Sequence, residues 1–482
     1  MLLCFIEYPI WMNISQLKYS DLRKLLDQGQ LTCVDIVKYY LSQIEAHNAT
    51  LHAFLEVYDT EALDKAALVD QKIKSGTAGE LAGLVIGIKD LLCYEDHHSY
   101  AGSKILQSFK STFSATAIQR LIDQDAIVIG RQNCDEFGMG STNENSAFGP
   151  ALNFKNTAHV AGGSSGGSAV AVQANMCHVS LGTDTGGSIR MPAAFCGVSG
   201  LKPTYGRVSR WGLIAYASSF DSIGPMARHL EDLALVLSHI SGADGQDSTV
   251  VSSNEFLAKK PIQGKRIAYI KEMAEHPSLQ ADIKKAFFEK LELLKSKGYQ
   301  VNAVDFPYVD ALLPTYYVLT TAEASSNLSR FDGVKFGHRT KVASKDLVDM
   351  YKKTRDEAFG EEVKRRIMLG TFVLSADYYD AYYTKAQKVR RLIKDFTQGL
   401  LQDHDFLVSP TTSSTAYRLG EKTMDPLQMY LGDLFTVQAN VAGLPAISIP
   451  MGEDSQSLPM GFQIMADVFQ EEAMLELATE LV

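Results

Sequence analysis

A lysine and two groups of serines are the side chains in this sequence whose types and spacing could carry out chemistry. Lys89 lies in the apolar run AGLVIGIKDLL, and serines occur in GGSSGGSAVAV (162–172) and GTDTGGSIRMPAAFCG (182–197). A serine hydroxyl becomes a nucleophile only when a base removes its proton. Burial lowers the pKa of a lysine by up to ~3–5 units, which makes the amine a base near neutral pH. The pattern therefore predicts a lysine-activated serine.

Each motif also has an ordinary explanation. A lysine in a buried strand often serves as an ion-pair partner, and no G-x-x-x-x-G-K-[ST] pattern makes the glycines a phosphate loop. The run 163–167 has the form G-x-S-x-G if Ser165 is the nucleophile, but no buried strand is expected ahead of it. No histidine can be assigned to a serine–histidine triad, and the adjacent His97 and His98 lack the spacing of a helical zinc site. We therefore expect no metal.

The most specific of these signals is Gly186-Gly187-Ser188, because two glycines before a serine let backbone N–H groups point at one oxyanion. With its neighbours from Gly162 to Pro225, this motif closely resembles the amidase signature family. The family spaces its lysine 75 residues before a bridging serine, which follows a cis peptide bond, and places the nucleophilic serine 24 residues further on. Lys89, Ser164 and Ser188 have this spacing, so the resemblance selects Ser164 over Ser165.

The resemblance implies a proton relay. Ser188 attacks an amide carbon and gives its proton to Ser164, which passes one to neutral Lys89. The resulting oxyanion is held by N–H groups around Thr185, Gly186, Gly187 and Ser188. Asp184 and Arg190 flank the nucleophile. Solvated charges would be the simple interpretation, but we expect this pair to fix the loop.

The resemblance continues from about Ile14 to the C-terminus, and is greatest to the glutaminase subunits of tRNA-dependent amidotransferases. Five stretches carry it: DEFGMGSTNENSAFGP (135–150), KPTYGRVSRWGLIAYASSFDSIGP (202–225), AEASSNLSRFDGVKFGHR (322–339), EEVKRRIMLGTFVLSADYYDAYYTKAQKVR (361–390) and YLGDLFTVQANVAGLPAISIP (430–450). In this family an arginine and an aspartate 67 residues apart are assigned to the α-carboxylate and α-ammonium of glutamine. Arg366 and Asp433 have this spacing. Tyr317, chosen over Tyr316, completes the expected pocket, whereas Arg365 or Arg366 could instead be an exposed helix charge.

The resemblance also implies partners. A B subunit would amidate glutamate on tRNA(Gln) or aspartate on tRNA(Asn), and a small C subunit would hold the glutaminase and the B subunit together. ATP and Mg²⁺ are expected on the partner, with no cofactor in this chain, and tRNA would be contacted through the B subunit. The net charge of −10 agrees with this, because an acidic chain is poorly suited to hold nucleic acid alone. The alternatives are a stand-alone amidase for a small aliphatic or aryl amide and an inactive scaffold.

The elements that must position these residues alternate irregularly. Helical spacing covers 15–76, with Thr32 as an N-cap; strands are expected at 82–92, 125–131, 266–270, 299–307, 406–412 and 446–451; helices are expected at 279–298 and over most of 311–402. Apolar helical stretches also interrupt the glycines of 161–212. The pattern predicts an α/β fold, a central mixed sheet covered by helices on both sides.

The resemblance implies one amidase signature domain over 12–482, with its signature core at about 82–230 and a helix-rich segment at about 311–402. Residues 1–11 lack the basic start of a signal peptide, and we expect a disordered or mis-annotated extension, with translation starting at Met12. There is no run of 18 apolar residues, so no membrane span is expected. The six cysteines are scattered without a C-x-x-C pair, which favours free thiols and a cytoplasmic location.

Overall fold

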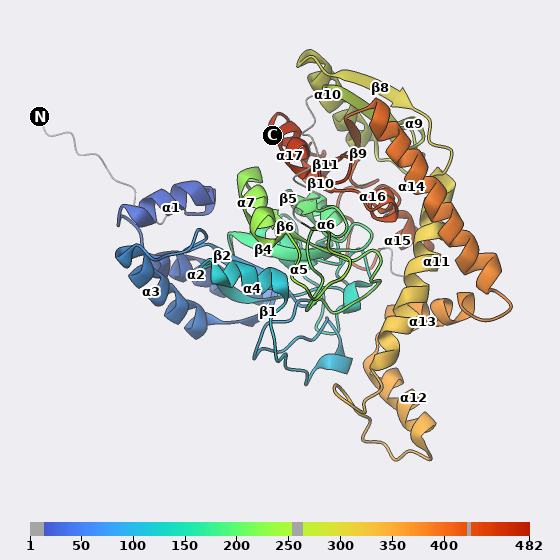
Figure 1. Ribbon diagram of the computed structural model, residues 1–482, viewed down its shortest axis with the longest axis horizontal. Coiled ribbons are helices and arrows are strands. Elements are labelled where there is room, and N and C mark those ends of the chain that lie inside the picture. Colours follow the sequence, from blue (N-terminus) through green and yellow to red (C-terminus); the bar gives the residue numbers. More distant parts are fainter. Residues whose placement is uncertain (1–13, 253–263, 422–425) are drawn as a thin grey trace, which may run out of the picture.

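Eleven strands form one mixed sheet in the computed structural model, which describes residues 14–252, 264–421 and 426–482 (Figure 1). The strand order is β1-β3-β2-β4-β6-β5-β10-β11-β9-β7-β8. The bounds are β1 Phe54–Val57, β2 Val85–Lys89, β3 Ile127–Gln132, β4 Val179–Asp184, β5 Ser199–Lys202, β6 Ser222–Ala227, β7 Arg266–Ile270, β8 Gln300–Val304, β9 Phe406–Pro410, β10 Ala446–Glu453 and β11 Pro459–Met465. The predicted α/β class with a central mixed sheet is confirmed.

The helices lie at both ends of the molecule and around its central strands (Figure 1). The α-helices are α1 Tyr19–Asp27, α2 Cys33–Leu51, α3 Asp59–Ser75, α4 Thr116–Asp123, α5 Gly166–Gln173, α6 Arg190–Cys196, α7 Leu230–Ile240, α9 Lys271–Ala274, α10 Ala281–Ser296, α11 Val309–Asn327, α12 Leu347–Ala358, α13 Glu361–Val373, α14 Lys385–Asp403, α15 Pro426–Leu431, α16 Val437–Ala442 and α17 Glu471–Thr479. The shorter turns are η2 Ile14–Gln16, η3 Lys104–Leu106, η4 Glu136–Gly138, η5 Leu328–Arg330 and the π-helix η6 Tyr379–Thr384.

The direction of the central strands brings two candidate site segments to one edge of the sheet. Strand β2 pairs in parallel with both β3 and β4, so the carboxyl ends of β2 and β4 lie at the same edge. Lys89 is the last residue of β2, and Asp184 is the last residue of β4. The loop containing Gly186, Gly187 and Ser188 therefore starts beside Lys89.

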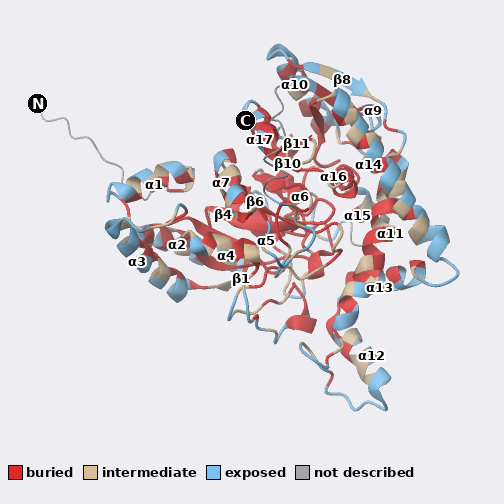
Figure 2. Cartoon of the chain, in the orientation of Figure 1, coloured by how far each residue is buried: buried red, intermediate tan, exposed pale blue. Residues whose placement is uncertain are grey.

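The central strands β2, β3, β4 and β6 are buried on both faces of the sheet. Ile86 and Ile88 of β2 pack in one hydrophobic cluster with α4 and α7, whereas Val85 packs in a second cluster with α2, α3, α5 and α6. Figure 2 shows buried residues concentrated in the central strands and in α5 and α6. Lys89 shares the strand face of Val85, because side chains alternate along a strand, and its Nζ contacts Ser164 and Ser165 just before α5.

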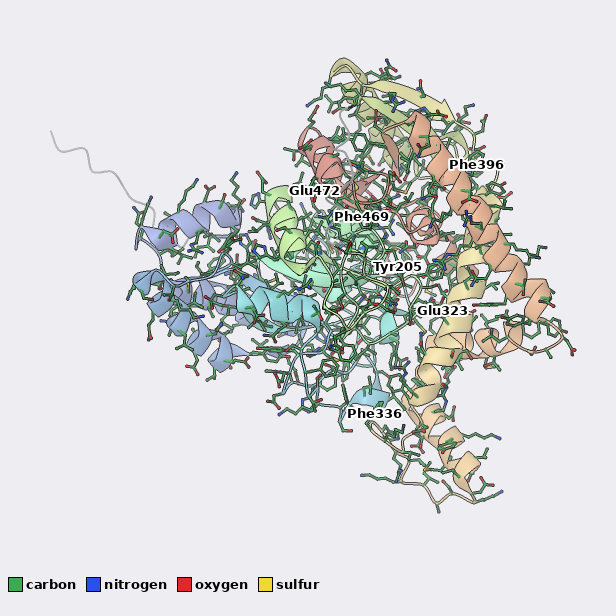
Figure 3. The ribbon with its side chains drawn as sticks, in the orientation of Figure 1. Tyr205, Glu323, Phe336, Phe396, Phe469 and Glu472 are labelled. Atoms are coloured by element: carbon green, nitrogen blue, oxygen red, sulfur yellow. The ribbon has the colours of Figure 1, made fainter. Side chains whose placement is uncertain are left out.

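The C-terminal helices pack around the second half of the sheet. Helix α14 contacts β9, α11 and α16, and Phe396 of α14 packs edge-to-face on Phe306 with ring centroids 5.4 Å apart (Figure 3). Helix α13 packs against α11. These contacts bring the segment around Arg366 toward the central sheet, although the signature motifs lie more than a hundred residues earlier.

Several expected elements are confirmed. Thr32 caps α2 in a capping box with Asp35, because its side chain accepts from the Asp35 N–H at 3.1 Å. The strands predicted within 82–92, 125–131, 266–270, 299–307, 406–412 and 446–451 are present as β2, β3, β7, β8, β9 and β10. The proposed extension at 1–11 and the start at Met12 lie outside the described residues.

Two expectations are wrong in detail. The segment 15–76 is not helical throughout, because β1 adds an antiparallel edge strand next to β3. Strands β4, β5, β6 and β11 were not predicted. Their sequences, such as VSLGTD in β4, contain glycine and small polar residues in place of a run of β-branched ones, and burial on both faces of the sheet holds them in place.

Candidate active site

Lys89 lies fully buried among hydroxyl groups. Its Nζ donates to Ser164 Oγ at 2.7 Å, to Ser165 Oγ at 2.8 Å and to Thr183 Oγ1 at 2.8 Å. Among the described residues its acceptors are hydroxyl and carbonyl oxygens, with no carboxylate, so the ion-pair explanation does not hold. Because burial disfavours the charged amine, the pKa of Lys89 falls to about 8. A neutral amine is therefore accessible near physiological pH.

The two neighbouring serines differ in their surroundings. Ser165 donates to the Thr183 carbonyl at 3.1 Å and accepts from the Thr183 N–H at 3.3 Å, so its hydroxyl joins α5 to β4. Ser164 follows a cis peptide bond from Gly163, as the resemblance implied for the bridging serine. The Ser165 N–H donates to the Ser188 carbonyl at 3.1 Å, which holds the two serine loops together. This arrangement favours Ser164 as the proton carrier.

The glycines of the second loop permit close approach by neighbouring side chains. A Cβ on Gly186 would overlap the Tyr316 hydroxyl, and one on Gly187 would overlap Thr436 Oγ1. Gly187 also has a φ of +129°, outside the range of ordinary side-chain-bearing residues. Thr436 Oγ1 donates to the Gly186 carbonyl at 2.6 Å. Substitution at either glycine would displace the loop that carries Ser188.

The backbone N–H of Gly187, one of the expected oxyanion donors, already binds a carboxylate of the protein. The Gly187 N–H donates to Asp184 Oδ1 at 2.8 Å, so it is directed at a carboxylate of the protein and not at a substrate oxygen. The Ile189 N–H likewise donates to Asp184 Oδ2 at 3.1 Å. Thr185, Gly186 and Ser188 remain the candidate donors. The role given to Gly187 fails because the folded loop turns around Asp184.

Asp184 and Arg190 form a completely buried ion pair, and the expectation that they fix the loop is confirmed. Arg190 Nε and Nη2 donate to the two Asp184 oxygens at 3.1 and 3.0 Å. Burial alone would raise the pKa of Asp184, but the Arg190 charge outweighs burial and lowers this pKa to about 2. Arg190 also donates to the Thr436 carbonyl at 2.9 Å and to Asn440 Oδ1 at 2.6 Å. The pair therefore joins the serine loop to α16.

Arg190→Ala is expected to destabilise the protein by about 3–5 kcal/mol, because it leaves the Asp184 charge buried without a partner. Amide hydrolysis should fall with it, since the serine loop loses its attachment to α16. Thermal unfolding and steady-state kinetics measure both effects. Arg391→Ala is the matched control, because Arg391 pairs with Asp395 at the surface and its loss should have little effect. An unchanged melting temperature and rate for Arg190→Ala would contradict this role.

The predicted glutamine-binding residues lie together. Tyr317 donates from its hydroxyl to Asp433 Oδ2 at 2.5 Å, and the Arg366 guanidinium lies 5.3 Å from the Tyr317 ring centroid. Arg366 and Asp433 are buried, whereas the Arg365 side chain is 42% exposed. Tyr316 instead packs over Gly186. These contacts favour Tyr317 over Tyr316 and Arg366 over Arg365 as the predicted pocket residues.

Asp433 connects this pocket to the serine loop. Its backbone carbonyl accepts from the Thr436 N–H at 3.0 Å, and Thr436 contacts Gly186. Its Oδ1 accepts from Ser141 Oγ at 2.6 Å. Burial raises the pKa of Asp433 to about 6, so at neutral pH the group still carries a negative charge.

Sequence reasoning missed four residues of the site. They are Thr183 beside Lys89, Ser141 beside Asp433, and Glu362 and Tyr216 around Arg366. Glu362 Oε1 accepts from Arg366 Nε at 2.7 Å, and the Tyr216 hydroxyl accepts from Arg366 Nη1 at 2.7 Å. The i, i+4 spacing of Glu362 and Arg366 on one helix was a usable signal. Thr183, Ser141 and Tyr216 are far in sequence from the residues they contact, so no local pattern predicts these contacts.

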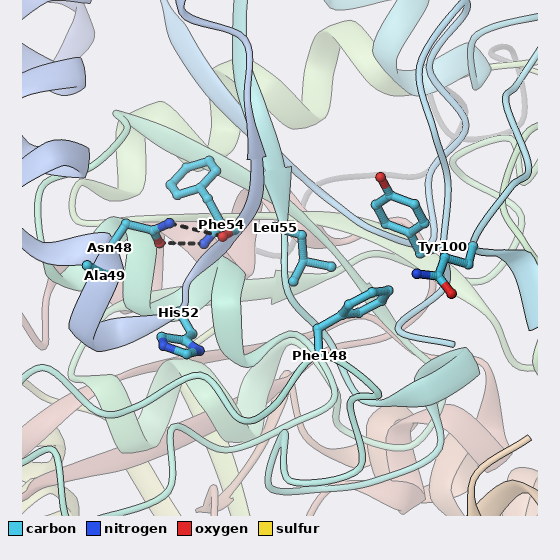
Figure 4. A pocket seen from close by; sticks show the side chains of 8 residues that line it. Asn48, Ala49, His52, Phe54, Leu55, Tyr100 and Phe148 are labelled. Carbon is cyan, nitrogen blue, oxygen red and sulfur yellow. Dashed lines mark hydrogen bonds between the residues drawn. The ribbon is translucent and has the colours of Figure 1, made fainter. Parts of the chain in front are cut away.

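Outside this site, the described residues that line a second cavity form no comparable cluster of reactive side chains. This open cavity of about 500 Å³ is lined by residues of α2, β1 and two loops, with no charged side chain (Figure 4). In it, Asn48 bonds the Phe54 backbone and so serves the local structure. Over the described ranges, no group of three His, Cys, Asp or Glu side chains could hold a metal ion, and no helix is long and apolar enough to cross a membrane. The described cysteines, Cys33, Cys93, Cys134, Cys177 and Cys196, are buried and free.

A family model described as Amidase matches residues 35–475. The chain therefore belongs to the amidase family, whose signature its Lys89, Ser164 and Ser188 spacing resembles.

More particular relatives are similar over nearly the whole length. The A subunit of glutamyl-tRNA(Gln) amidotransferase from Chlorobium phaeobacteroides is 47% identical, over 95% of this chain and 97% of the relative. The protein of the same name from Ralstonia nicotianae is 46% identical, over 97% of each chain. The solved structure of its counterpart from Thermotoga maritima is 36% identical with a TM-score of 0.76, and covers 96% of this chain and 93% of its own. A peptide amidase from Stenotrophomonas maltophilia is 28% identical, with a TM-score of 0.80 and coverage of 98% and 97%.

Proposed function

We propose that this chain is the glutaminase subunit of an aminoacyl-tRNA amidotransferase. It hydrolyses glutamine to glutamate and supplies ammonia for amidation of Glu-tRNA(Gln), Asp-tRNA(Asn) or both. Relatives with the amidotransferase name, 46–47% identical over nearly the full length, support this function over that of a stand-alone amidase. The observation that supports this proposal most directly is that two buried residues of opposite charge, Arg366 and Asp433, lie near the serine loop. Thr436 connects Asp433 to this loop through its hydrogen bond to the Gly186 carbonyl.

These two charges match the end of glutamine that a simple amide lacks. Arg366 is oriented by Glu362 and Tyr216, which bind its Nε and Nη1 and leave Nη2 to pair with the α-carboxylate of the substrate. Asp433 offers its carboxylate to the α-ammonium. Tyr317 stacks on Tyr430 with ring centroids 4.2 Å apart and forms the wall between the two charges. A neutral amide offers no cation to Asp433 and no carboxylate to Arg366, whose guanidinium otherwise pairs with Glu362.

The chemistry begins with a proton transfer. Ser164 gives its proton to neutral Lys89 and takes one from Ser188, whose oxygen attacks the amide carbon. The carbonyl oxygen becomes an oxyanion, which is held by N–H groups from Thr185, Gly186 and Ser188. The amide nitrogen leaves as ammonia after it receives the relayed proton. Water then hydrolyses the glutamyl ester on Ser188 and releases glutamate.

The partners follow from the same proposal. A B subunit receives the ammonia, binds tRNA, ATP and Mg²⁺, and activates the acceptor carboxylate; a C subunit completes the complex in the cytoplasm. The net charge of −10 supports the proposal that a partner subunit binds the tRNA, because an acidic surface repels its phosphates. An exposed aromatic patch also supports a partner surface. It consists of Phe372, Tyr378, Tyr379 and Tyr382, each about two-fifths exposed.

Arg366→Met is expected to raise KM for glutamine by roughly 10- to 100-fold, since a charged hydrogen bond to the α-carboxylate is lost. The KM for propionamide, which has no carboxylate, should stay within about twofold. Lys364→Met is the matched control, because Lys364 lies on the same helix and pairs with Asp356 and Glu361, away from Glu362. Steady-state ammonia release measures each constant. Equal effects of Arg366→Met on both amides would remove the assignment to glutamine.

A further inference from the structure

Asp221 is a buried carboxylate next to the site that the proposed mechanism does not use. It directly precedes β6, and β6 pairs antiparallel with β4 in the register Asp184 to Ser222. One step beyond that pair, Asp221 faces Thr185, the first residue of the loop that carries Ser188. The sheet register itself therefore places this carboxylate beside the candidate oxyanion donors.

The two oxygens of Asp221 bind different parts of the chain. Oδ1 accepts from Thr185 Oγ1 at 2.7 Å, whereas Oδ2 accepts from the Tyr216 N–H at 3.0 Å. The Ala217 N–H lies 3.2 and 3.1 Å from the two oxygens. One side chain thus joins the serine loop to the turn at 216–217. Burial raises the pKa of Asp221 to about 6, so it is an ionised acceptor at neutral pH.

The turn at 216–217 leads directly to the glutamine pocket. Tyr216 accepts from Arg366 Nη1 through its hydroxyl at 2.7 Å, and its ring centroid lies 5.5 Å from the guanidinium carbon. Asp221 therefore holds the backbone of the residue whose side chain orients Arg366. Asn327 supports the same backbone from α11, since its Nδ2 donates to the Tyr216 carbonyl at 3.2 Å.

The rest of this loop is fixed from the outside. Glu323, labelled on α11 in Figure 3, accepts from the Ser219 N–H at 2.9 Å, and Arg390 of α14 donates to the Ser219 carbonyl at 2.9 Å. Because the C-terminal helices hold Ser219, the loop cannot follow freely when Thr185 moves. Asp221 is the direct connection between this fixed loop and Thr185.

We propose that Asp221 is a positioning residue that sets the distance between the two ends of the glutamine site. Through Thr185 it aligns the N–H groups that face the amide oxygen, and through Tyr216 it aligns Arg366 with the α-carboxylate. The inference rests on the proposed function, because only a substrate with both an amide and a carboxylate needs this alignment. Displacement of a reacting group by about 1 Å costs up to roughly 100-fold in rate.

Asp221→Asn tests the connection with a side chain of the same shape. The amide replaces one acceptor oxygen by an NH₂ donor, so the contacts to Thr185 Oγ1 and to the N–H groups of Tyr216 and Ala217 cannot all be kept. For glutamine we expect kcat to fall roughly 10- to 100-fold and KM to rise several-fold. For propionamide we expect the loss in kcat without the rise in KM, since that substrate does not reach Arg366.

Two further variants separate the halves of the connection. Thr185→Val removes the hydroxyl and should lower kcat on both amides with KM for glutamine unchanged; Thr185→Ser, which keeps the hydroxyl, should restore it. Tyr216→Phe should raise KM for glutamine alone. The double variant Asp221→Asn/Thr185→Val should lose no more kcat than the larger of its single variants, because both break one contact.

The outcomes are decisive in each direction. The proposal would be overturned if Asp221→Asn kept kcat and KM for glutamine within about twofold of wild type. It would also be overturned if the variant had a lower melting temperature and lost the same fraction of kcat/KM on glutamine and on propionamide. If Asp221→Asn does not fold, wild-type kcat for Thr185→Val would overturn it instead. Failure of the proposed function would show separately, as wild-type enzyme without preference for glutamine. The Thr185 comparison on propionamide would still test the link to the loop.

Discussion

Ser188→Ala is expected to abolish glutamine hydrolysis, with a loss in kcat of roughly 10⁴-fold or more, while the chain folds normally. The reason is that Ser188 supplies the bond-forming oxygen, and no other group in the mechanism can replace it. Ser188 keeps 8% of its surface exposed, so removal of its hydroxyl leaves no buried cavity of consequence. Ammonia release and thermal unfolding measure the two halves of this result.

Ser168→Ala is the matched control for this experiment. Ser168 lies on α5 close to the same motif, and its Oγ is buried without a hydrogen-bond partner among the described residues. Its replacement should leave both activity and stability close to wild type. Residual turnover near wild type in Ser188→Ala would refute the nucleophile assignment, whatever the control shows.

Lys89→Met should be nearly as damaging, with a loss in kcat of roughly 10³-fold or more, because no base remains to accept the relayed proton. The variant should nevertheless fold. Methionine fills a similar volume, and Ser165 keeps its hydrogen bonds to the Thr183 carbonyl and N–H when the amine is lost. The measurement is single-turnover hydrolysis of glutamine, with circular dichroism as the check on folding.

The pH dependence gives this prediction a second readout. Because burial lowers the pKa of Lys89 to about 8, wild-type kcat/KM should rise with pH through about 8 as the amine becomes neutral. The unfolded chain binds this proton up to the ordinary pKa of 10.5. The contribution of Lys89 to the free energy of unfolding should therefore increase with pH between about 8 and 10.5. In Lys89→Met both pH dependences should be absent. If kcat/KM of this variant still rose with pH near 8, a group other than Lys89 would be the base.

Much of the fold could be predicted from the sequence, because hydrophobic period is a local property. The apolar run around Lys89 predicted the strand β2, and Thr32 predicted the start of α2. Strand β4 could not be predicted in the same way. Its sequence VSLGTD contains little strand preference, and its pairing with β2 and β6 depends on residues far along the chain.

The residues of the candidate site likewise differ in whether they could be predicted from the sequence. The resemblance to the amidase signature selected Lys89, Ser164 and Ser188, and the structure places all three within two adjoining loops and one strand end. Residues that support them were not predictable, because their contacts span the fold: Ser141 and Asp433, for example, are 292 residues apart. The expected role of Gly187 failed for a similar reason, since the direction of its N–H depends on how Asp184 is held by Arg190.

The most direct test of the central claim is ammonia release from glutamine compared with propionamide, measured on the chain alone and with the proposed B and C subunits co-expressed. The proposed function predicts a strong preference for glutamine that rises when partners and charged tRNA are added. Equal or faster turnover of propionamide, indifferent to partners, would contradict it and would leave Arg366 and Asp433 as structural charges in a stand-alone amidase.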